Sequence, residues 1–144
     1  MKHMERARWS ANPTLTGAAR SALGANLPAV FSSCDETWSA LEAAGIEEDD
    51  PIWRLPLHKP YRKMIESKVA DISSTAGEGA QGGAIIAALF LREFCADVPR
   101  WLHIDTSAWT NSTFSGPGKP EGGEALGLRA LWRFVSARYG TNRG

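Results

Sequence analysis

The sequence predicts an α/β domain, and three observations support that fold class. The chain has 144 residues, 43% of them apolar, which suits one domain with a hydrophobic core of its own. Short apolar stretches of strand length alternate with longer stretches in which apolar residues recur at helical spacing. Across residues 69–105, a strand pattern, a Gly-rich loop, a helix pattern and a second strand pattern follow one another. That order is typical of a βαβ unit, in which helices cover the faces of a sheet.

The N-terminal third of the chain predicts a tail, a strand and a helix. Charged and polar residues break any apolar period over residues 1–13, so we expect a tail or loop there. Residues 27–31 are apolar and predict a strand. Ser33 and Glu36 have the spacing of a capping box, in which each side chain satisfies a free backbone N–H of the first helical turn. Apolar residues at helical spacing then extend this helix to Gly45 or beyond.

The middle of the chain contains two further strand patterns and two helix patterns. Residues 53–57 (WRLPL) alternate in polarity but contain Pro56, which suits an edge strand or an extended loop. Residues 61–68 predict a short charged helix, and residues 69–72 predict a strand. Residues 84–94 are apolar on nearly every side, so we expect a helix that packs against other elements over most of its surface.

The C-terminal part predicts a strand, a long loop and a last helix. The strand is expected at residues 101–105. Residues 106–123 are rich in Ser, Thr, Gly and Pro, and a loop of that length indicates a functional lining or an interface segment. Apolar residues between 128 and 139 share one face of a helix, which Gly140 can end.

Charge and composition argue against several classes of function. The 16 Lys and Arg residues balance 16 Asp and Glu residues, so we expect neither a nucleic-acid nor an anionic-membrane partner. The longest uncharged apolar stretch, residues 82–91, is about half as long as a bilayer-spanning helix. The basic start of the chain lacks the apolar segment of a secretory signal. Cys34 and Cys95 are too few for a disulfide framework. We therefore expect a soluble cytoplasmic domain.

The Gly-rich loop contains a literal G-x-G-x-x-G motif at residues 77–82, directly before a predicted helix. Asp105 ends the following strand, about where a ribose-binding carboxylate would lie in a dinucleotide-binding unit. Two features oppose this hypothesis: residues 73–76 separate the first glycine from the strand, and the Glu78 carboxylate would repel a pyrophosphate. A tight loop-to-helix packing site is the structural alternative.

Other polar residues suggest chemistry only weakly. His103 and Asp105 share a face of one strand and Asp71 ends another, so these residues either contribute to a metal site or form ordinary buried hydrogen bonds. Ser115 has no base at a suggestive spacing, and no G-x-S-x-G motif occurs. Cys95 ends an apolar helix and is expected to be an inert core thiol. Residue chemistry alone therefore predicts no catalytic residue and no metal ligand.

Six short stretches nevertheless follow one another in a recognisable order. They are T-L-T-G-A at 14–18, W-R-L-P-L at 53–57, S-K-V-A-D at 67–71, the helix segment 83–94 ending in F-L-R-E-F, W-x-H-x-D at 101–105 and G-G-E-A-x-G-L-R at 122–129. In order and spacing they resemble the C-terminal catalytic domain of the leucyl aminopeptidase (cytosol aminopeptidase) family, from residue 14 to about residue 136. Family members have a Gly-rich loop before the same apolar helix, which accounts for the glycine motif.

The resemblance implies an activity and a fold. The family removes N-terminal residues, typically leucine, from peptides with two divalent metal ions, zinc or manganese, held by a lysine and carboxylates. Its signature N-T-D-A-E-G-R belongs upstream of the T-L-T-G stretch and occurs nowhere in this chain. We therefore expect no metal ligand, no cofactor and no catalytic residue in these residues, and an aminopeptidase fragment that is inactive alone. The implied fold is a truncated zinc-exopeptidase-like domain with a partial, mixed, largely parallel sheet flanked by helices.

The resemblance also implies which residues contact a peptide substrate. Thr14, Leu15 and Gly17 match family residues that line the cleft, and Ser107 and Thr110 match the floor of the pocket for the first side chain.

The expected organisation and partners follow from the same resemblance. Residues 1–13 are an atypical N-terminal tail, residues 14–140 the C-terminal part of the catalytic domain and residues 141–144 a second tail. Family members form hexamers through this domain, so a homo-oligomer is compatible with the sequence. Two alternatives stay open: a non-catalytic assembly or binding module derived from the family, and a nucleotide-binding βαβ domain.

Overall fold

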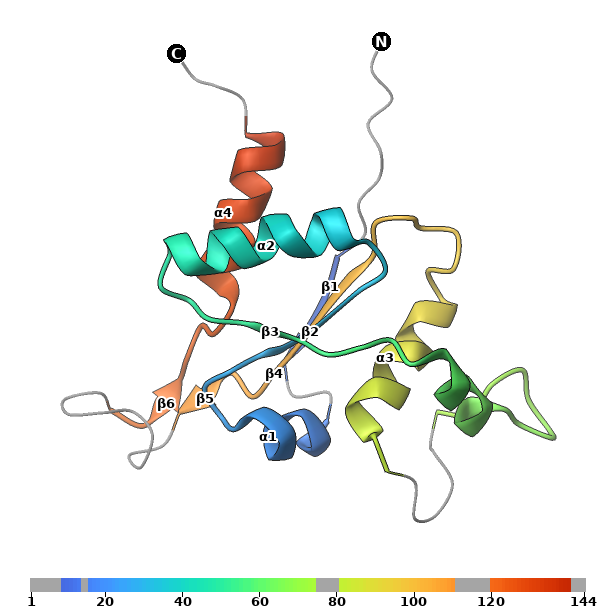
Figure 1. The fold of residues 1–144 in the computed structure, drawn as a ribbon. Helices are drawn as coiled ribbons and strands as arrows, with labels where there is room; N and C mark the ends of the chain where they lie inside the picture. Colours follow the sequence, from blue (N-terminus) through green and yellow to red (C-terminus); the bar gives the residue numbers. More distant parts are fainter. Residues whose placement is uncertain (1–8, 14–15, 75–80, 111–119, 141–144) are drawn as a thin grey trace, which may run out of the picture.

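The computed structural model describes residues 9–13, 16–74, 81–110 and 120–140. The elements follow in chain order as labelled in Figure 1: β1 (Trp9–Pro13), α1 (Gly17–Leu23), β2 (Ala29–Ser32), α2 (Asp35–Glu47), β3 (Trp53–Arg54), the 3-10 helix η1 (Lys59–Ile65), α3 (Gly83–Glu93), β4 (Leu102–Thr106), β5 (Trp109–Thr110), β6 (Gly122–Gly123) and α4 (Leu128–Tyr139).

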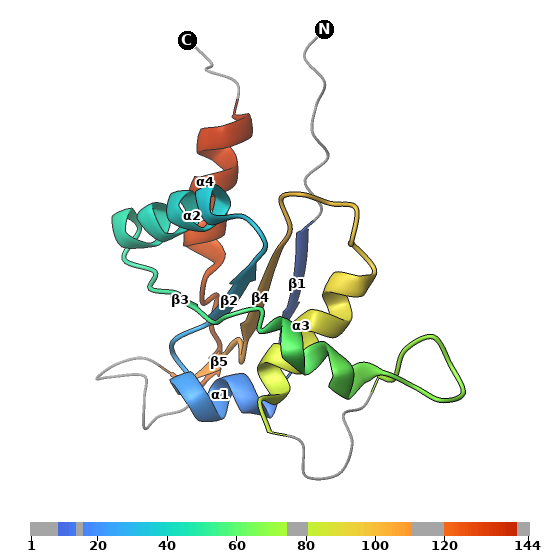
Figure 2. The same ribbon diagram turned by 45° about the vertical axis from the view of Figure 1, so that its right-hand side comes forward.

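Four of the strands form one mixed sheet in the order β1-β4-β2-β3. The outer pairs β1–β4 and β2–β3 are parallel, whereas the central pair β4–β2 is antiparallel. Helices α2 and α4 lie on one side of this sheet and α1 and α3 on the other, as Figures 1 and 2 show. The structure thus confirms the predicted α/β class with a mixed sheet flanked by helices.

Alternation along the central strands divides the core into two clusters, because successive side chains of a strand point to opposite faces. In β2, Val30 contacts the α2/α4 side while Ala29 and Phe31 contact the α1/α3 side. The first cluster contains Val30, Leu41, Ala44, Ile52, Leu102, Ile104, Ala130 and Phe134. The second contains Ala19, Ala29, Phe31, Ala84, Ala88, Val98 and Trp101.

Most of the predicted elements are present. The strands expected at residues 27–31 and 101–105 are β2 and β4, and the helices expected from the periodic apolar residues are α2, α3 and α4. The WRLPL segment begins with the short edge strand β3, and the charged helix expected at 61–68 is the 3-10 helix η1. Among the described helices, none is long and apolar enough to span a membrane.

The prediction of a tail over residues 1–13 is wrong for its last five residues. Residues 9–13 form β1, which pairs in parallel with β4 from Trp9↔Leu102 to Pro13↔Thr106. Trp9, Ala11 and Pro13 alternate with the polar residues Ser10 and Asn12, but this alternation covers only five residues, follows a charged stretch and ends in a proline. The strand is therefore established by the backbone ladder with β4 rather than by its local pattern. Residues 1–8 lie outside the described residues.

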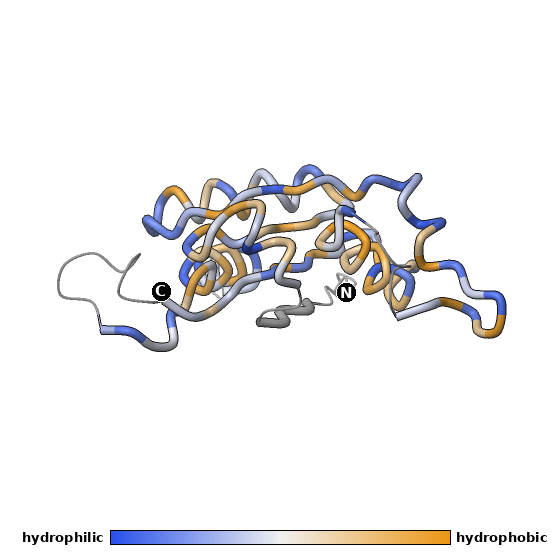
Figure 3. The backbone as a smooth tube through the Cα atoms, turned by 90° about the horizontal axis from the view of Figure 1, so that it is seen from below, coloured by the Kyte–Doolittle hydropathy of each residue, from blue (hydrophilic) through white to orange (hydrophobic). Residues whose placement is uncertain are grey.

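The strand predicted at residues 69–72 is absent, and with it the βαβ unit expected over residues 69–105. The segment forms bends, in which the Ser67 hydroxyl accepts hydrogen bonds from the backbone N–H groups of Val69 and Ala70. Val69 is 97% exposed, and the segment lies at the edge of the molecule in Figure 3. Because no strand precedes the glycines, the nucleotide-binding hypothesis loses its structural basis. Residues 77–80 of the glycine motif lie outside the described residues.

Two local predictions also need correction. Cys34, not Ser33, is the N-cap of α2, and the Ser33 hydroxyl instead donates to the carbonyl of Pro99 and accepts from the N–H of Trp101. The expected loop at 106–123 contains the antiparallel pair β5–β6. Its residues 111–119, including Ser115, lie outside the described residues.

Candidate functional site

The candidate site lies where β1 and β4 end together. Pro13 pairs with Thr106 at the last position of the parallel ladder, and α1 begins at Gly17, four residues after β1. The carboxyl ends of parallel strands are the usual location of binding sites in α/β proteins. We define the candidate site as residues 16–17, at the start of α1, together with residues 105–110, which form the last two positions of β4 and the segment after it.

Two hydrogen bonds between Asp105 and Thr16 hold the candidate site together. The Thr16 hydroxyl donates to Asp105 Oδ2 over 2.7 Å, and the Thr16 N–H donates to Asp105 Oδ1 over 3.4 Å. The same hydroxyl accepts from the N–H of Ala19 over 3.1 Å and thereby caps α1. The Asp105 side chain is buried, with 2% of its residue surface exposed. Asp105 therefore fixes the position at which α1 begins relative to the end of β4.

The predicted substrate-binding residues have different surroundings. Gly17 begins α1, and a Cβ built there would meet no described atom within 4 Å, so space is open beside it. The Ser107 hydroxyl donates to the carbonyls of Ala25, over 2.8 Å, and Trp109. Thr110 is buried in β5. Gly17 thus directly follows Thr16, and Ser107 follows Asp105 by two residues, so both lie next to the Thr16–Asp105 hydrogen bonds. The Thr110 side chain, in contrast, is buried.

Thr14 and Leu15, the other two predicted substrate-binding residues, lie outside the described residues. Two other residues of the candidate site, Thr16 and Ala108, were not predicted from the sequence. Thr16 stood inside the T-L-T-G stretch, where an N-cap threonine is a readable signal. Ala108 has a positive φ of 48°, an unfavourable conformation for alanine, and its alanine side chain gives no sign of it in the sequence.

Small cavities lie on both sides of the candidate site. One of about 300 Å³ is lined by Thr16 and mainly apolar residues: Ile65, Ser74, Gly83, Ile86, Ala87, Phe90 and Leu91. Another of about 180 Å³ includes Thr106 and Ala108 in its lining. A larger cavity of about 890 Å³ lies elsewhere, between the segment that follows β3 and helix α3.

The polar residues considered as metal ligands do not come together. His103 is fully buried and stacks on Phe31 and Trp101, with ring centroids 5.9 and 6.0 Å apart, while Asp71 is exposed in the bend segment. Within the described residues, no group of three or more His, Cys, Asp and Glu could hold a metal ion. Asp105 instead accepts the hydrogen bonds from Thr16. These residues do not fit a dinuclear metal centre.

Comparison with known proteins gives a consistent result. The model of the cytosol aminopeptidase family, catalytic domain, matches residues 10–132. A probable cytosol aminopeptidase of Nitrobacter winogradskyi is 38% identical over 130 residues, which are 90% of this chain and 25% of the relative. One of Chlorobium phaeobacteroides is 40% identical over 118 residues, 82% of this chain and 23% of the relative. The chain thus spans about a quarter of the length of these curated relatives.

Solved structures agree with the sequence relatives. The crystal structure of cytosol aminopeptidase from Coxiella burnetii superimposes with a TM-score of 0.78 at 46% identity, over 91% of this chain and 27% of that one. The bottromycin maturation enzyme BotP in complex with Mn superimposes with a TM-score of 0.79 at 32% identity, over 90% of this chain and 28% of that one.

Proposed function

The chain belongs to the cytosol aminopeptidase family, and we propose that it forms the part of the catalytic domain that supplies one wall of a peptide-binding cleft. The hydrogen bonds between Thr16 and Asp105 are the observation that supports this most directly. They fix Gly17 beside the carboxyl end of β4, close to Ser107. The proposed substrate is a peptide with a free N-terminus, and the proposed location is the cytoplasm, in keeping with the names of the relatives.

The surroundings of the wall suit an apolar side chain of the bound peptide. The cavity of about 300 Å³ beside Thr16 is lined by Ile86, Phe90 and Leu91, which would favour such a side chain. Gly17 leaves open space at the start of α1, where a peptide backbone could approach without meeting a side chain. The family resemblance adds four further residues to the proposed substrate-binding wall: Thr14, Leu15, Ser107 and Thr110.

The same proposal assigns peptide hydrolysis to metal ions, for which the described residues contain no group of three or more His, Cys, Asp and Glu. A pair of divalent ions would polarise the scissile carbonyl and supply a hydroxide. Both carboxylates buried in the described core already accept hydrogen bonds: Asp105 from Thr16, and Asp50 from the N–H groups of Gly127 and Ala130. We therefore expect the 144 residues to hydrolyse no peptide by themselves.

Backbone NMR with a leucyl dipeptide tests the proposed wall. We expect amide shifts at residues 16–19 and 107–108 on titration with leucylglycine, and none in α4. The variant Thr16→Val, which lacks the hydroxyl that bonds Asp105, should weaken these shifts, while Thr16→Ser should retain them. Absence of shifts at the candidate site, or shifts confined to the lining of the cavity of about 890 Å³, would contradict the proposal.

A non-catalytic assembly module is the second candidate function. The observation that favours it is the outer face of α4, where Leu128, Trp132 and Tyr139 are exposed. Light scattering after size-exclusion chromatography measures the oligomeric state. We expect an oligomer that Trp132→Glu dissociates, and a monodisperse monomer of the unmodified chain would contradict this function.

A further inference from the structure

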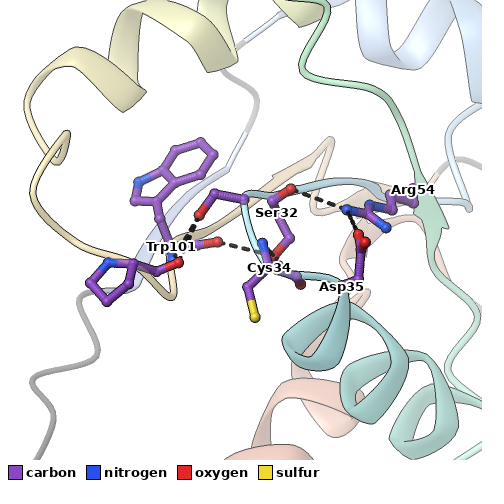
Figure 4. A network of polar contacts seen from close by, with 7 residues as sticks. Ser32, Cys34, Asp35, Arg54 and Trp101 are labelled. Carbon is purple, nitrogen blue, oxygen red and sulfur yellow. Dashed lines mark hydrogen bonds and ion pairs between the residues drawn. The ribbon is translucent and has the colours of Figure 1, made fainter.

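Cys34 stands at the start of α2, at the end of β2. It is the N-cap residue of this 13-residue helix and is half-buried. Its backbone is held firmly, since its N–H donates to the Ser32 hydroxyl over 3.2 Å and its carbonyl accepts from the same hydroxyl over 3.0 Å. In Figure 4 the sulfur points away from Ser32 and Arg54. The thiol is therefore positioned by its backbone and open on one side.

Thr37, one turn into α2, has an unusual hydroxyl. The residue is 1% exposed, and Thr37 Oγ1 has no hydrogen-bonding partner among the described residues. Leaving a buried hydroxyl without a partner costs free energy, so such a group in a folded protein needs an explanation. Thr37 follows Cys34 by three residues, which places the two side chains on the same side of the first turn of α2, and the Thr37 side chain is the largest cause that lowers the pKa of the Cys34 thiol.

A thiolate would satisfy that hydroxyl, whereas a neutral thiol is a weak acceptor. The backbone N–H groups of Thr37 and Glu36 also lower the pKa of Cys34, and the Arg100 charge adds to them, while partial burial opposes them. A helix N-terminus carries partial positive charge, which favours an anion. The donors around the sulfur are therefore arranged for its ionised form.

The acidic side chains near Cys34 do not cancel the lowering of its pKa. Two acidic side chains follow it on α2, and each is paired with arginine. Asp35 lies 2.6 Å from Arg54, and Glu36 lies 3.0 Å from Arg100, which precedes β4. Arg138 of α4 lies 3.8 Å from the other oxygen of Glu36. With both carboxylates paired, the start of α2 stays electropositive.

Cys95 provides an internal comparison, because it is half-buried as well. It follows the opposite end of a helix: α3 ends at Glu93, and the Cys95 N–H donates to the carbonyl of Arg92 over 3.0 Å. The last turn of a helix presents free carbonyl groups, whereas the first turn presents free N–H donors. The two cysteines thus have similar exposure and opposite helix ends.

We propose that Cys34 is a reactive thiol that undergoes reversible exchange with small-molecule disulfides. Its thiolate attacks one sulfur of the disulfide, a new bond forms between Cys34 Sγ and that sulfur, and the original S–S bond breaks. The departing sulfur takes the electron pair and then a proton from water. Cys34 is oxidised as the small disulfide is reduced, so no other oxidant is required. The site uses no residue of the proposed peptide-binding wall.

The two single-cysteine variants of the full chain test the proposal. In Cys95→Ser only Cys34 remains, and in Cys34→Ser only Cys95 remains. Release of the coloured thiolate from 5,5′-dithiobis(2-nitrobenzoate) gives the reaction rate of each thiol across a pH series. A thiol gains about threefold in rate per unit of lowered pKa, because the larger thiolate fraction outweighs its weaker nucleophilicity. We expect Cys34 to react faster near neutral pH, by about threefold for each unit by which its measured pH midpoint lies below that of Cys95. Equal rates and equal midpoints would overturn the proposal.

The Thr37 hydroxyl is tested separately in the Cys95→Ser background. Thr37→Val removes only the hydroxyl and keeps the branched shape, so we expect a higher pH midpoint and a slower reaction of Cys34. Thr37→Ser should restore both, which a merely structural role for Thr37 would not do. An unchanged pH profile in Thr37→Val, with an unchanged circular dichroism spectrum, would overturn the role of this hydroxyl.

Mass spectrometry after exposure to oxidised glutathione tests the exchange with a second disulfide. We expect one adduct on Cys34, reversed by dithiothreitol. An adduct on Cys95 alone, or none, would contradict the proposal.

Discussion

The two faces of the sheet differ in what their helices contribute to the core. Helices α2 and α4 bury the large side chains Leu41 and Phe134 as well as alanines. In the cluster under α1 and α3, the helices contribute alanines at positions 19, 84 and 88, and the large side chains, Phe31 and Trp101, come from β2 and from the residue before β4. Large interlocking side chains stabilise a layer strongly, whereas small ones let backbones approach and leave room for polar groups. The α2/α4 face is thus mainly structural, and the α1/α3 face holds the candidate site.

A single strand serves both faces. Leu102 and Ile104 of β4 join the core under α2 and α4, while the residues between and after them, His103 and Asp105, contact Phe31 and Thr16 on the other side. Because side chains alternate along a strand, the five residues of β4 alternate between those that pack in the α2/α4 core and those that contact the side of the candidate site. Substitutions on the two faces should therefore differ in kind, global on one and local on the other.

The largest effect is expected on the α2/α4 face. Phe134→Ala should lower the free energy of unfolding by about 3–5 kcal/mol, because it removes a buried aromatic ring from the core. Ala137→Gln on the same helix is the control, since Ala137 is exposed and its replacement should cost less than about 0.5 kcal/mol. Urea unfolding followed by circular dichroism measures both. Similar losses in the two variants would show that α4 packs through another face.

Substitution of Asp50, on the same face, should have the second-largest effect on stability. Its carboxylate accepts from the N–H of Gly127 over 3.0 Å and of Ala130 over 3.1 Å, both at the start of α4. Asp50→Ala leaves two buried donors without an acceptor and should cost about 2–4 kcal/mol. Asp50→Asn keeps one acceptor oxygen and should cost less. Equal stability of the two variants, measured by thermal unfolding, would contradict this role of the carboxylate.

On the α1/α3 face the expected effect is smaller and local. Thr16→Val removes the cap of α1 and the bond to Asp105, at a cost of about 1–2 kcal/mol. Hydrogen exchange should become faster in α1 while α4 stays protected, and Thr16→Ser should resemble the unmodified chain. A uniform loss of protection in both helices would remove the distinction between the two faces.

The smallest effect concerns an exposed ion pair between α2 and α4. A hydrogen bond from Arg133, 2.7 Å away, holds the pKa of Glu47 below its ordinary value. A carboxylate with a lowered pKa stabilises the fold fully above its unfolded-state pKa, and this contribution is lost as the pH falls through the lowered value.

Glu47→Gln should therefore slightly reduce the melting temperature at neutral pH and flatten its fall on acidification to about pH 3. Salt should shrink the difference. A melting curve of Glu47→Gln that parallels the unmodified chain over the whole range would contradict a contribution from this pair.

Elements with a strong period of their own could be predicted from the sequence. Helix α4 and strand β4 are among them, because their apolar residues repeat at the spacing that burial requires, and α3 was predictable from a continuous apolar stretch of helical length. Strand β1 was missed, because its alternation covers only five residues after a charged stretch. Residues 69–72 include three apolar residues, yet residues 69–71 are exposed, so composition predicted a strand that tertiary packing does not provide.

The candidate site was predictable only in part. The family resemblance indicated Gly17 and Ser107, and the structure brings both near the Thr16–Asp105 bonds. That contact joins residues 89 positions apart, which no local pattern can reveal. The predicted capping box failed for a similar reason, because Ser33 is drawn into contacts with the distant residues Pro99 and Trp101.

Hydrolysis of leucine p-nitroanilide by the purified 144-residue chain, with Mn²⁺ or Zn²⁺ added, tests the central claim most directly. That claim is that these residues supply a wall of the substrate cleft and no metal centre. We expect a rate no higher than that of the metal salt alone, because the described residues contain no group of three or more His, Cys, Asp and Glu that could hold a metal ion. Metal-dependent turnover that rises in proportion to the protein concentration would contradict the account.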